Sequence, residues 1–170
     1  MKLLHYFHGL EPNKKTLPIL YSLTVALSII LCVYNYGKYE LYQTIVIGIL
    51  SLDLIGGILF NLTKSTKRFW QTSDVKLKTI FLFAHVLQPL VMAFFLRVDL
   101  ILAFGLFIYM FLCGFLLLKL NKEWNKIFCV LMTAFGIYIF QEFNFPMQYN
   151  WFLIAYLTKL LISFSLKETS

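Results

Sequence analysis

Long apolar segments alternate with short polar ones along the whole chain. A helix needs about 20 mainly apolar residues to cross the roughly 30 Å of hydrocarbon in a membrane. Six segments meet this requirement, at residues 16–35, 42–62, 79–96, 100–119, 126–143 and 149–166. None shows the alternation of apolar and polar positions that a membrane-spanning strand requires. The pattern predicts an all-α, polytopic integral membrane protein: a bundle of six transmembrane helices in which residues 1–170 form a single domain.

Lys and Arg are distributed unevenly over the segments that connect these helices. Twelve of the 15 basic residues fall in the segments on one side of the predicted bundle, and only Lys38 and Arg97 fall on the other. Basic connections are retained on the cytoplasmic side of a membrane. We therefore expect both the N-terminus and the C-terminus to be cytoplasmic. Because the sequence has no organelle-targeting signal, we expect a multi-pass protein of the plasma (cell) membrane.

Composition supports the membrane interpretation and excludes other classes. Hydrophobic residues make up 60% of the chain, charged residues 14%, and the mean hydropathy is +0.77, which excludes a water-soluble globular protein. The net charge of +7 comes from bases between apolar segments, so we expect no nucleic-acid partner. Cys32, Cys113 and Cys129 lie in apolar segments without a paired Cys or a His cluster. We expect packed free thiols, no metal and no cofactor.

Three ionisable residues stand inside the predicted helices, where lipid tolerates charge poorly. Asp53, His85 and Lys159 each lie within about 4 Å of the centre of their helix, at 1.5 Å of rise per residue. Such residues face the interior of a bundle and are candidates for a functional site. For Lys159 three arrangements stay open: extension towards the headgroups, an ion pair with Asp53, or an uncharged amine.

The second predicted helix has one face of small and polar residues. Asp53, Gly57 and Asn61 recur every four residues and so share this face, with Gly56 beside it and Gly48 further along. Glycines allow a neighbouring helix or a ligand to approach the backbone closely. Packing has no need for a carboxylate, so this face is predicted to line a binding site.

The third predicted helix combines polar side chains with a proline. Pro89 has no N–H to offer to the carbonyl of His85, and its ring should kink the helix there. Gln88 lies on a neighbouring part of the surface and can share the site with His85. The candidate binding residues are thus Asp53, Gly57, Asn61, His85, Gln88 and Lys159.

Three classes of function fit these residues. The first is a protein that binds, and can transport, a small or lipophilic molecule or a proton. The second is an intramembrane enzyme acting on a lipid or isoprenoid, with His85 as general base and Asp53 orienting it. The third is an accessory subunit whose glycine face packs against another membrane protein or a second copy. The sequence leaves enzymatic activity open.

The lipid bilayer itself is the remaining predicted partner. The segment 63–78 carries Lys64, Lys67 and Arg68, which would attract anionic headgroups or act only as a topology signal. This segment is also the only connection long enough to hold structure of its own.

Overall fold

Every regular element in the described part of the chain is a helix. The computed structural model describes residues 8–10 and 12–167. The elements are α2 (Thr16–Asn35), α3 (Leu41–Asn61), α4 (Lys64–Thr72), α5 (Val75–Ala84), α6 (Leu87–Leu96), α7 (Leu100–Lys119), α8 (Lys122–Glu142), the 3₁₀ helix η1 (Met147–Tyr149), α9 (Asn150–Leu157) and the π-helix η2 (Thr158–Phe164). The predicted all-α class is therefore confirmed for these residues.

Five helical segments are long and apolar enough to cross a membrane. They are Thr16–Asn35, Leu41–Asn61, Val75–Leu96, Leu100–Lys119 and Lys122–Glu142. The first and fourth begin and end at the predicted residues. The other three start one to four residues earlier than predicted, and the second and fifth end one residue earlier. The longer starts have a physical cause: Asp74 and Asn121 accept hydrogen bonds from the first turns of α5 and α8, which extends both helices into the polar connections.

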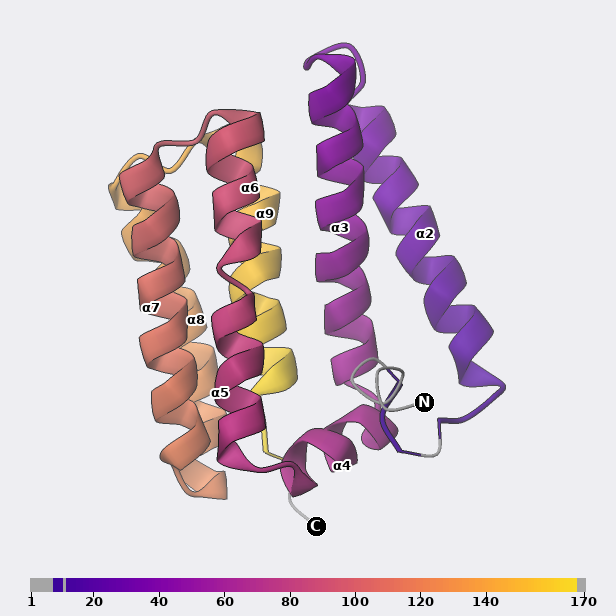
Figure 1. Ribbon diagram of the computed structural model, residues 1–170, viewed down its shortest axis with the longest axis vertical. Coiled ribbons are helices and arrows are strands. Elements are labelled where there is room, and N and C mark those ends of the chain that lie inside the picture. Colours follow the sequence, from indigo (N-terminus) through magenta and orange to yellow (C-terminus); the bar gives the residue numbers. More distant parts are fainter. Residues whose placement is uncertain (1–7, 11, 168–170) are drawn as a thin grey trace.

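The sixth predicted segment takes a different form from a single long helix. Residues 149–166 were predicted as one span, but α9 has eight residues and the π-helix η2 that follows it has seven. Both are packed among other helices: α9 contacts α3 and α8, and η2 contacts α3, α7 and α8. Phe152, Tyr156 and Leu160 have no exposed surface. This segment is the centre of the bundle, behind α5 and α6 in Figure 1.

The interruption predicted at Pro89 is present. Helix α5 ends at Ala84 and α6 begins at Leu87, so His85 and Val86 lie between them. The Tyr156 hydroxyl donates a hydrogen bond of 3.0 Å to the His85 carbonyl oxygen. A buried carbonyl without its helical partner needs such a donor. The central helix thereby fixes the point where the α5–α6 segment breaks.

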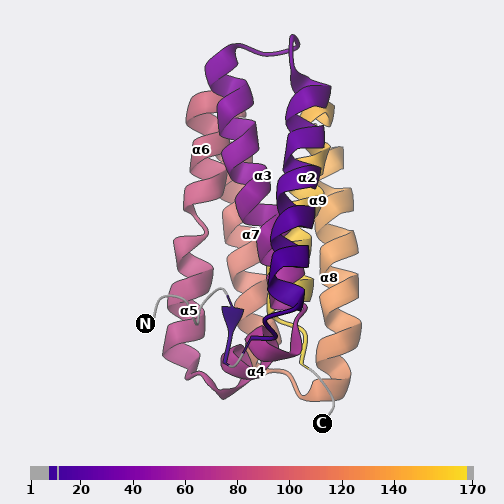
Figure 2. The same cartoon turned by 90° about the vertical axis from the view of Figure 1, so that its right-hand side faces the viewer.

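One end of the bundle is covered by α4, whereas the α2–α3, α6–α7 and α8–α9 connections lie at the other end (Figures 1 and 2). The α4 end also receives both ends of the described chain. The Leu10 amide donates to the Ser65 carbonyl of α4, and the Lys167 amide donates to the Asn125 side chain of α8. The two ends therefore lie on the same side of the bundle, while which side faces the cytoplasm stays a prediction.

The Tyr156 hydrogen bond predicts a measurable coupling with Pro89. Tyr156→Phe leaves the His85 carbonyl without its donor and should lower the free energy of unfolding by about 1 to 3 kcal/mol. In a Pro89→Ala background, residue 89 regains an N–H for the His85 carbonyl. There, Tyr156→Phe should lower the free energy of unfolding by less. A double-mutant cycle of unfolding in denaturing detergent measures the difference. Equal effects of Tyr156→Phe in the two backgrounds would contradict this role.

Candidate functional site

A cavity of about 410 Å³ opens between α2, α3, the α5–α6 segment and η2. Its lining includes every binding residue predicted from the sequence, although these come from three separate segments of the chain. They are Asp53, Gly57, Asn61, His85, Gln88 and Lys159. The structure therefore brings the six candidates together around one space, with apolar neighbours such as Val25, Leu52 and Phe81.

The centre of the site is an ion pair between Asp53 and Lys159. The Lys159 ammonium lies 2.8 Å from each carboxylate oxygen of Asp53. The Lys159 side chain is 4% exposed, whereas the Asp53 side chain is 40% exposed. Of the three arrangements considered for Lys159, the structure has the ion pair. Because the lysine is covered and the carboxylate is open, the charge that faces the cavity is that of Asp53.

Gln88 adds a second donor to the same carboxylate. Its Nε2 donates a hydrogen bond of 2.8 Å to Oδ2 of Asp53. Among the described residues its Oε1 atom is buried and has no hydrogen-bond partner. A buried carbonyl oxygen without a donor is costly in free energy. The site therefore contains one acceptor that a bound molecule could satisfy.

His85 lines the cavity but is not paired with Asp53. Its Nδ1 lies 2.7 Å from the Phe81 carbonyl oxygen. A carbonyl only accepts, so Nδ1 carries the hydrogen, and in the neutral ring Nε2 is then an acceptor. Within residues 8–10 and 12–167, Nε2 has no hydrogen-bond partner. The His85–Asp53 contact that the enzyme hypothesis requires is absent from the hydrogen bonds of these residues.

Gly57 explains how Lys159 reaches Asp53. A Cβ atom at position 57 would lie 2.3 Å from Cε of Lys159, so the lysine side chain passes directly over the α3 backbone. The other glycines of this face serve packing against α2: a Cβ at Gly56 would meet Thr24, and one at Gly48 would meet Cys32. The predicted face is thus divided between a helix contact and the ion pair.

Asn61 lies at the α4 end of the cavity. It is 5% exposed and lines both this cavity and a second one nearer α4. No hydrogen bond of its side chain is found among the described residues. The cavity also uses Tyr21 and Thr24 of α2, which sequence reasoning missed because α2 contains no Asp, Glu, His, Lys or Arg. Sequence reasoning also missed Tyr156, which hydrogen bonds to the His85 carbonyl. Its spacing of three residues from Lys159 places both residues on one side of a helix.

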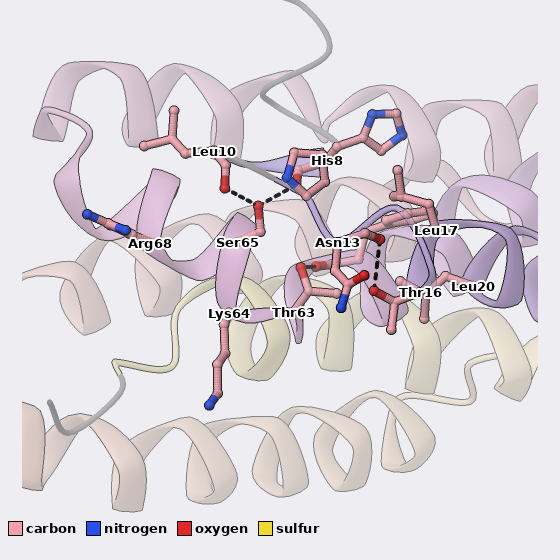
Figure 3. Close-up of a pocket in the computed structure, with 12 residues that line it drawn as sticks. His8, Leu10, Asn13, Thr16, Leu17, Leu20, Thr63, Lys64, Ser65 and Arg68 are labelled. Carbon is pink, nitrogen blue, oxygen red and sulfur yellow. Dashed lines mark hydrogen bonds between the residues drawn. The ribbon is translucent and has the colours of Figure 1, made fainter.

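The three basic residues predicted to attract lipid headgroups do not form one patch. Lys64 and Arg68 line a third cavity, of about 470 Å³, between α4 and the start of α2. Their side chains point in different directions there, while Ser65 hydrogen bonds to the His8 and Leu10 carbonyls (Figure 3). Lys67 instead lines the second cavity. Headgroup binding by these three residues stays a prediction.

The described part of the chain has no group of side chains suited to bind a metal ion. No three His, Cys, Asp or Glu side chains are grouped as metal ligands would be within residues 8–10 and 12–167. A comparison of the sequence and structure with family models, characterised proteins and solved structures finds no match.

Removing the two charges of the ion pair one at a time should have unequal effects on stability. Asp53→Asn leaves a covered ammonium without a partner and should lower the free energy of unfolding by about 3 to 5 kcal/mol. Lys159→Met leaves the more exposed Asp53 carboxylate without its partner and should lower the free energy of unfolding by less than Asp53→Asn does. The double variant should lose less free energy of unfolding than the two single variants lose in sum. Equal single effects with an additive double variant, measured by unfolding in denaturing detergent, would contradict the pair.

Gly57→Ala should displace the Lys159 side chain from Asp53. We expect a lower midpoint of thermal unfolding, even though alanine favours a helix by about 1 kcal/mol over glycine. Gly105→Ala is the matched control, because a Cβ there would meet only Phe140, at 3.9 Å. The difference in midpoint between the Gly57→Ala and Gly105→Ala variants should vanish in an Asp53→Asn, Lys159→Ala background. Equal midpoints for the two alanine variants would contradict the close approach.

Proposed function

We propose that this chain is a multi-pass protein of the plasma membrane that binds a small or lipophilic molecule in the cavity around Asp53. In this proposal Asp53 and Gln88 contact the ligand, and Lys159 holds the carboxylate in place. The observation that carries the proposal is the ion pair itself: one of its charges is covered by protein, and the other is open to a cavity inside an otherwise apolar bundle. Polar groups in such a position are characteristic of membrane-protein binding sites.

The proposed topology has six crossings. Helix α9 and η2 together supply the sixth, protected from lipid by the helices around them. With both termini cytoplasmic, the α4 end of the bundle faces the cytoplasm, which agrees with the excess of Lys and Arg there. The cavity around Asp53 then lies inside the membrane. Transport of the ligand, or of a proton with it, is an extension of this function.

A purely structural role for the pair is the main competing explanation, and two features weigh against it. An ion pair serving only stability would be enclosed, yet the Asp53 side chain is 40% exposed. The Gln88 Oε1 atom is also buried without a partner in the described structure, which only lowers stability unless a ligand binds there.

The enzyme hypothesis has less support than binding. A general base must be oriented by a partner and must reach the proton that it removes. The Asp53 oxygens instead accept hydrogen bonds from Lys159 and Gln88. His85 keeps an available Nε2 at the cavity, so it suits recognition of a donor group on the ligand.

Native mass spectrometry of the purified chain tests the proposal. The wild type should carry a bound molecule through mild detergent, and the Asp53→Asn, Lys159→Met double variant should lose most of it. This double variant leaves no unpaired charge, so it should remain folded. Lys119→Met is the control, because Lys119 is exposed and lies outside the cavity. Equal occupancy of the wild type and the double variant, including none in either, would overturn the proposal.

A further inference from the structure

Three hydrogen-bond acceptors border the cavity around Asp53 with capacity to spare. Oδ2 of Asp53 accepts from both Lys159 and Gln88, whereas Oδ1 accepts from Lys159 alone. A carboxylate oxygen can accept two hydrogen bonds, so Oδ1 can take one more. Gln88 Oε1 and His85 Nε2 are further acceptors without a partner in the described structure. The three acceptors come from α3 and the α5–α6 segment, and their side chains line the same space.

Donor groups of the same lining are directed at the protein itself. Lys159 directs hydrogens at both oxygens of Asp53, and Gln88 directs one at Oδ2. The Thr24 hydroxyl donates to the Leu20 carbonyl at 2.8 Å. A ligand able only to accept hydrogen bonds would leave the three acceptors unsatisfied, which is unfavourable for covered groups. The lining therefore favours a ligand that donates hydrogen bonds.

The charges around the cavity already balance each other. Asp53 and Lys159 form an ion pair, and the other described residues of the lining include no further Asp, Glu, Lys or Arg. An ammonium ligand at Asp53 would lie close to the Lys159 ammonium and would have no counterion of its own. A carboxylate ligand would meet the Asp53 carboxylate in the same way. Because an unbalanced charge inside an apolar bundle is unfavourable, the lining favours an uncharged ligand.

The remainder of the lining is mainly apolar and suits an apolar part of the same molecule. It includes Val25 of α2, Leu52 and Phe60 of α3, and Phe81 and Ala84 of α5. The volume of about 410 Å³ is within the range of small-molecule sites. Such sites combine a largely apolar wall with a few polar groups that orient the ligand. The matching molecule has a polar group at Asp53 and an apolar body beside it.

We propose that the cavity around Asp53 binds an uncharged molecule whose polar group donates hydrogen bonds through N–H or O–H to Asp53, Gln88 and His85. A primary amide offers two such donors on one nitrogen, and two neighbouring hydroxyls offer one each. Both groups are uncharged, so they leave the ion pair balanced. This inference rests on the proposed function and gives its ligand a chemical class. The amide and the diol share their donor chemistry, and the experiment separates them.

Calorimetry of octanamide and octane-1,2-diol with the purified full chain in lipid nanodiscs is the test, after subtraction of the heat from empty nanodiscs. The probe that binds more tightly identifies the donor group. The methylated counterparts, N,N-dimethyloctanamide and 1,2-dimethoxyoctane, keep the apolar body and lack the donors. They should bind at least tenfold more weakly, as should octylammonium and octanoate, which are charged. Binding of neither donor probe, or equal binding of its methylated counterpart, would overturn the proposal.

Removing one acceptor should affect only the probes that donate. Gln88→Leu should weaken binding of the tighter donor probe about tenfold and leave its methylated counterpart nearly unchanged. His85→Phe should act in the same way, and the His85 main-chain carbonyl keeps its bond from Tyr156. Gln141→Leu is the matched control, because Gln141 is exposed on α8 and does not line the cavity. Equal weakening of both probes by Gln88→Leu, or the same loss with Gln141→Leu, would count against these contacts.

Removing the covered charge should change the kind of ligand that the site prefers. In Lys159→Met the Asp53 carboxylate has no counterion, so octylammonium should bind at least tenfold more tightly than to the wild type. A variant that merely failed to fold could not show this gain. Lys119→Met is the control, because Lys119 is exposed and lies outside the cavity. Absence of the gain in Lys159→Met would show that the charge argument is wrong.

These results separate the ligand class from the proposed function. If octylammonium or octanoate binds the wild type best, and the Asp53→Asn, Lys159→Met double variant loses that binding, the class is wrong and the proposed function stands. The same holds if no probe binds while native mass spectrometry still finds a molecule that only the wild type retains. Equal occupancy of the wild type and the double variant in mass spectrometry would instead overturn the proposed function.

Discussion

The arrangement of the bundle around its cavity depends on the ion pair between Asp53 and Lys159. A charge inside an apolar bundle is unfavourable unless its partner lies in contact, so this pair fixes how η2 sits against α3. The contact is possible because Gly57 lets the lysine cross the α3 backbone. The next residue of α3 on this face, Asn61, lines this cavity and the one nearer α4. One contact thus sets both the packing of the central helix and the shape of the site.

The central segment, α9 and η2, also holds the broken α5–α6 segment in place on the other side of the cavity. Tyr156 donates to the carbonyl that Pro89 leaves without a partner, while Gln88, one residue before the proline, donates to Asp53. A broken helix and a wide π-helix therefore meet at the ion pair. Irregular backbone inside a membrane protein is tolerated where it is enclosed by protein or lines a cavity, and π-helices are frequent at functional sites. Both irregularities here lie beside the same cavity.

Local features were predictable from the sequence, and features that depend on convergence were not. Helix α2, helix α7 and the break near Pro89 follow from apolar length and from the missing N–H. Asp53, Gly57 and Asn61 could be grouped because their spacing fixes a shared helix face. The partner of Lys159 could not be assigned, since three arrangements satisfy its chemistry equally. The division of α9 from η2 and the presence of Lys78 and Lys122 at the same cavity depend on packing between distant segments. The pattern of one sequence carries no signal for such packing.

The distance between the Asp53 carboxyl carbon and the Lys159 nitrogen, in the chain reconstituted in lipid bilayers, tests the central claim most directly. Solid-state NMR with both atoms isotopically labelled measures it through their dipolar coupling. The account predicts the strong coupling of two groups in direct contact, retained in the bilayer, together with a lysine signal protected from water. Absence of coupling, with the lysine signal in contact with headgroup water, would show that Lys159 extends to the membrane surface and would contradict the account.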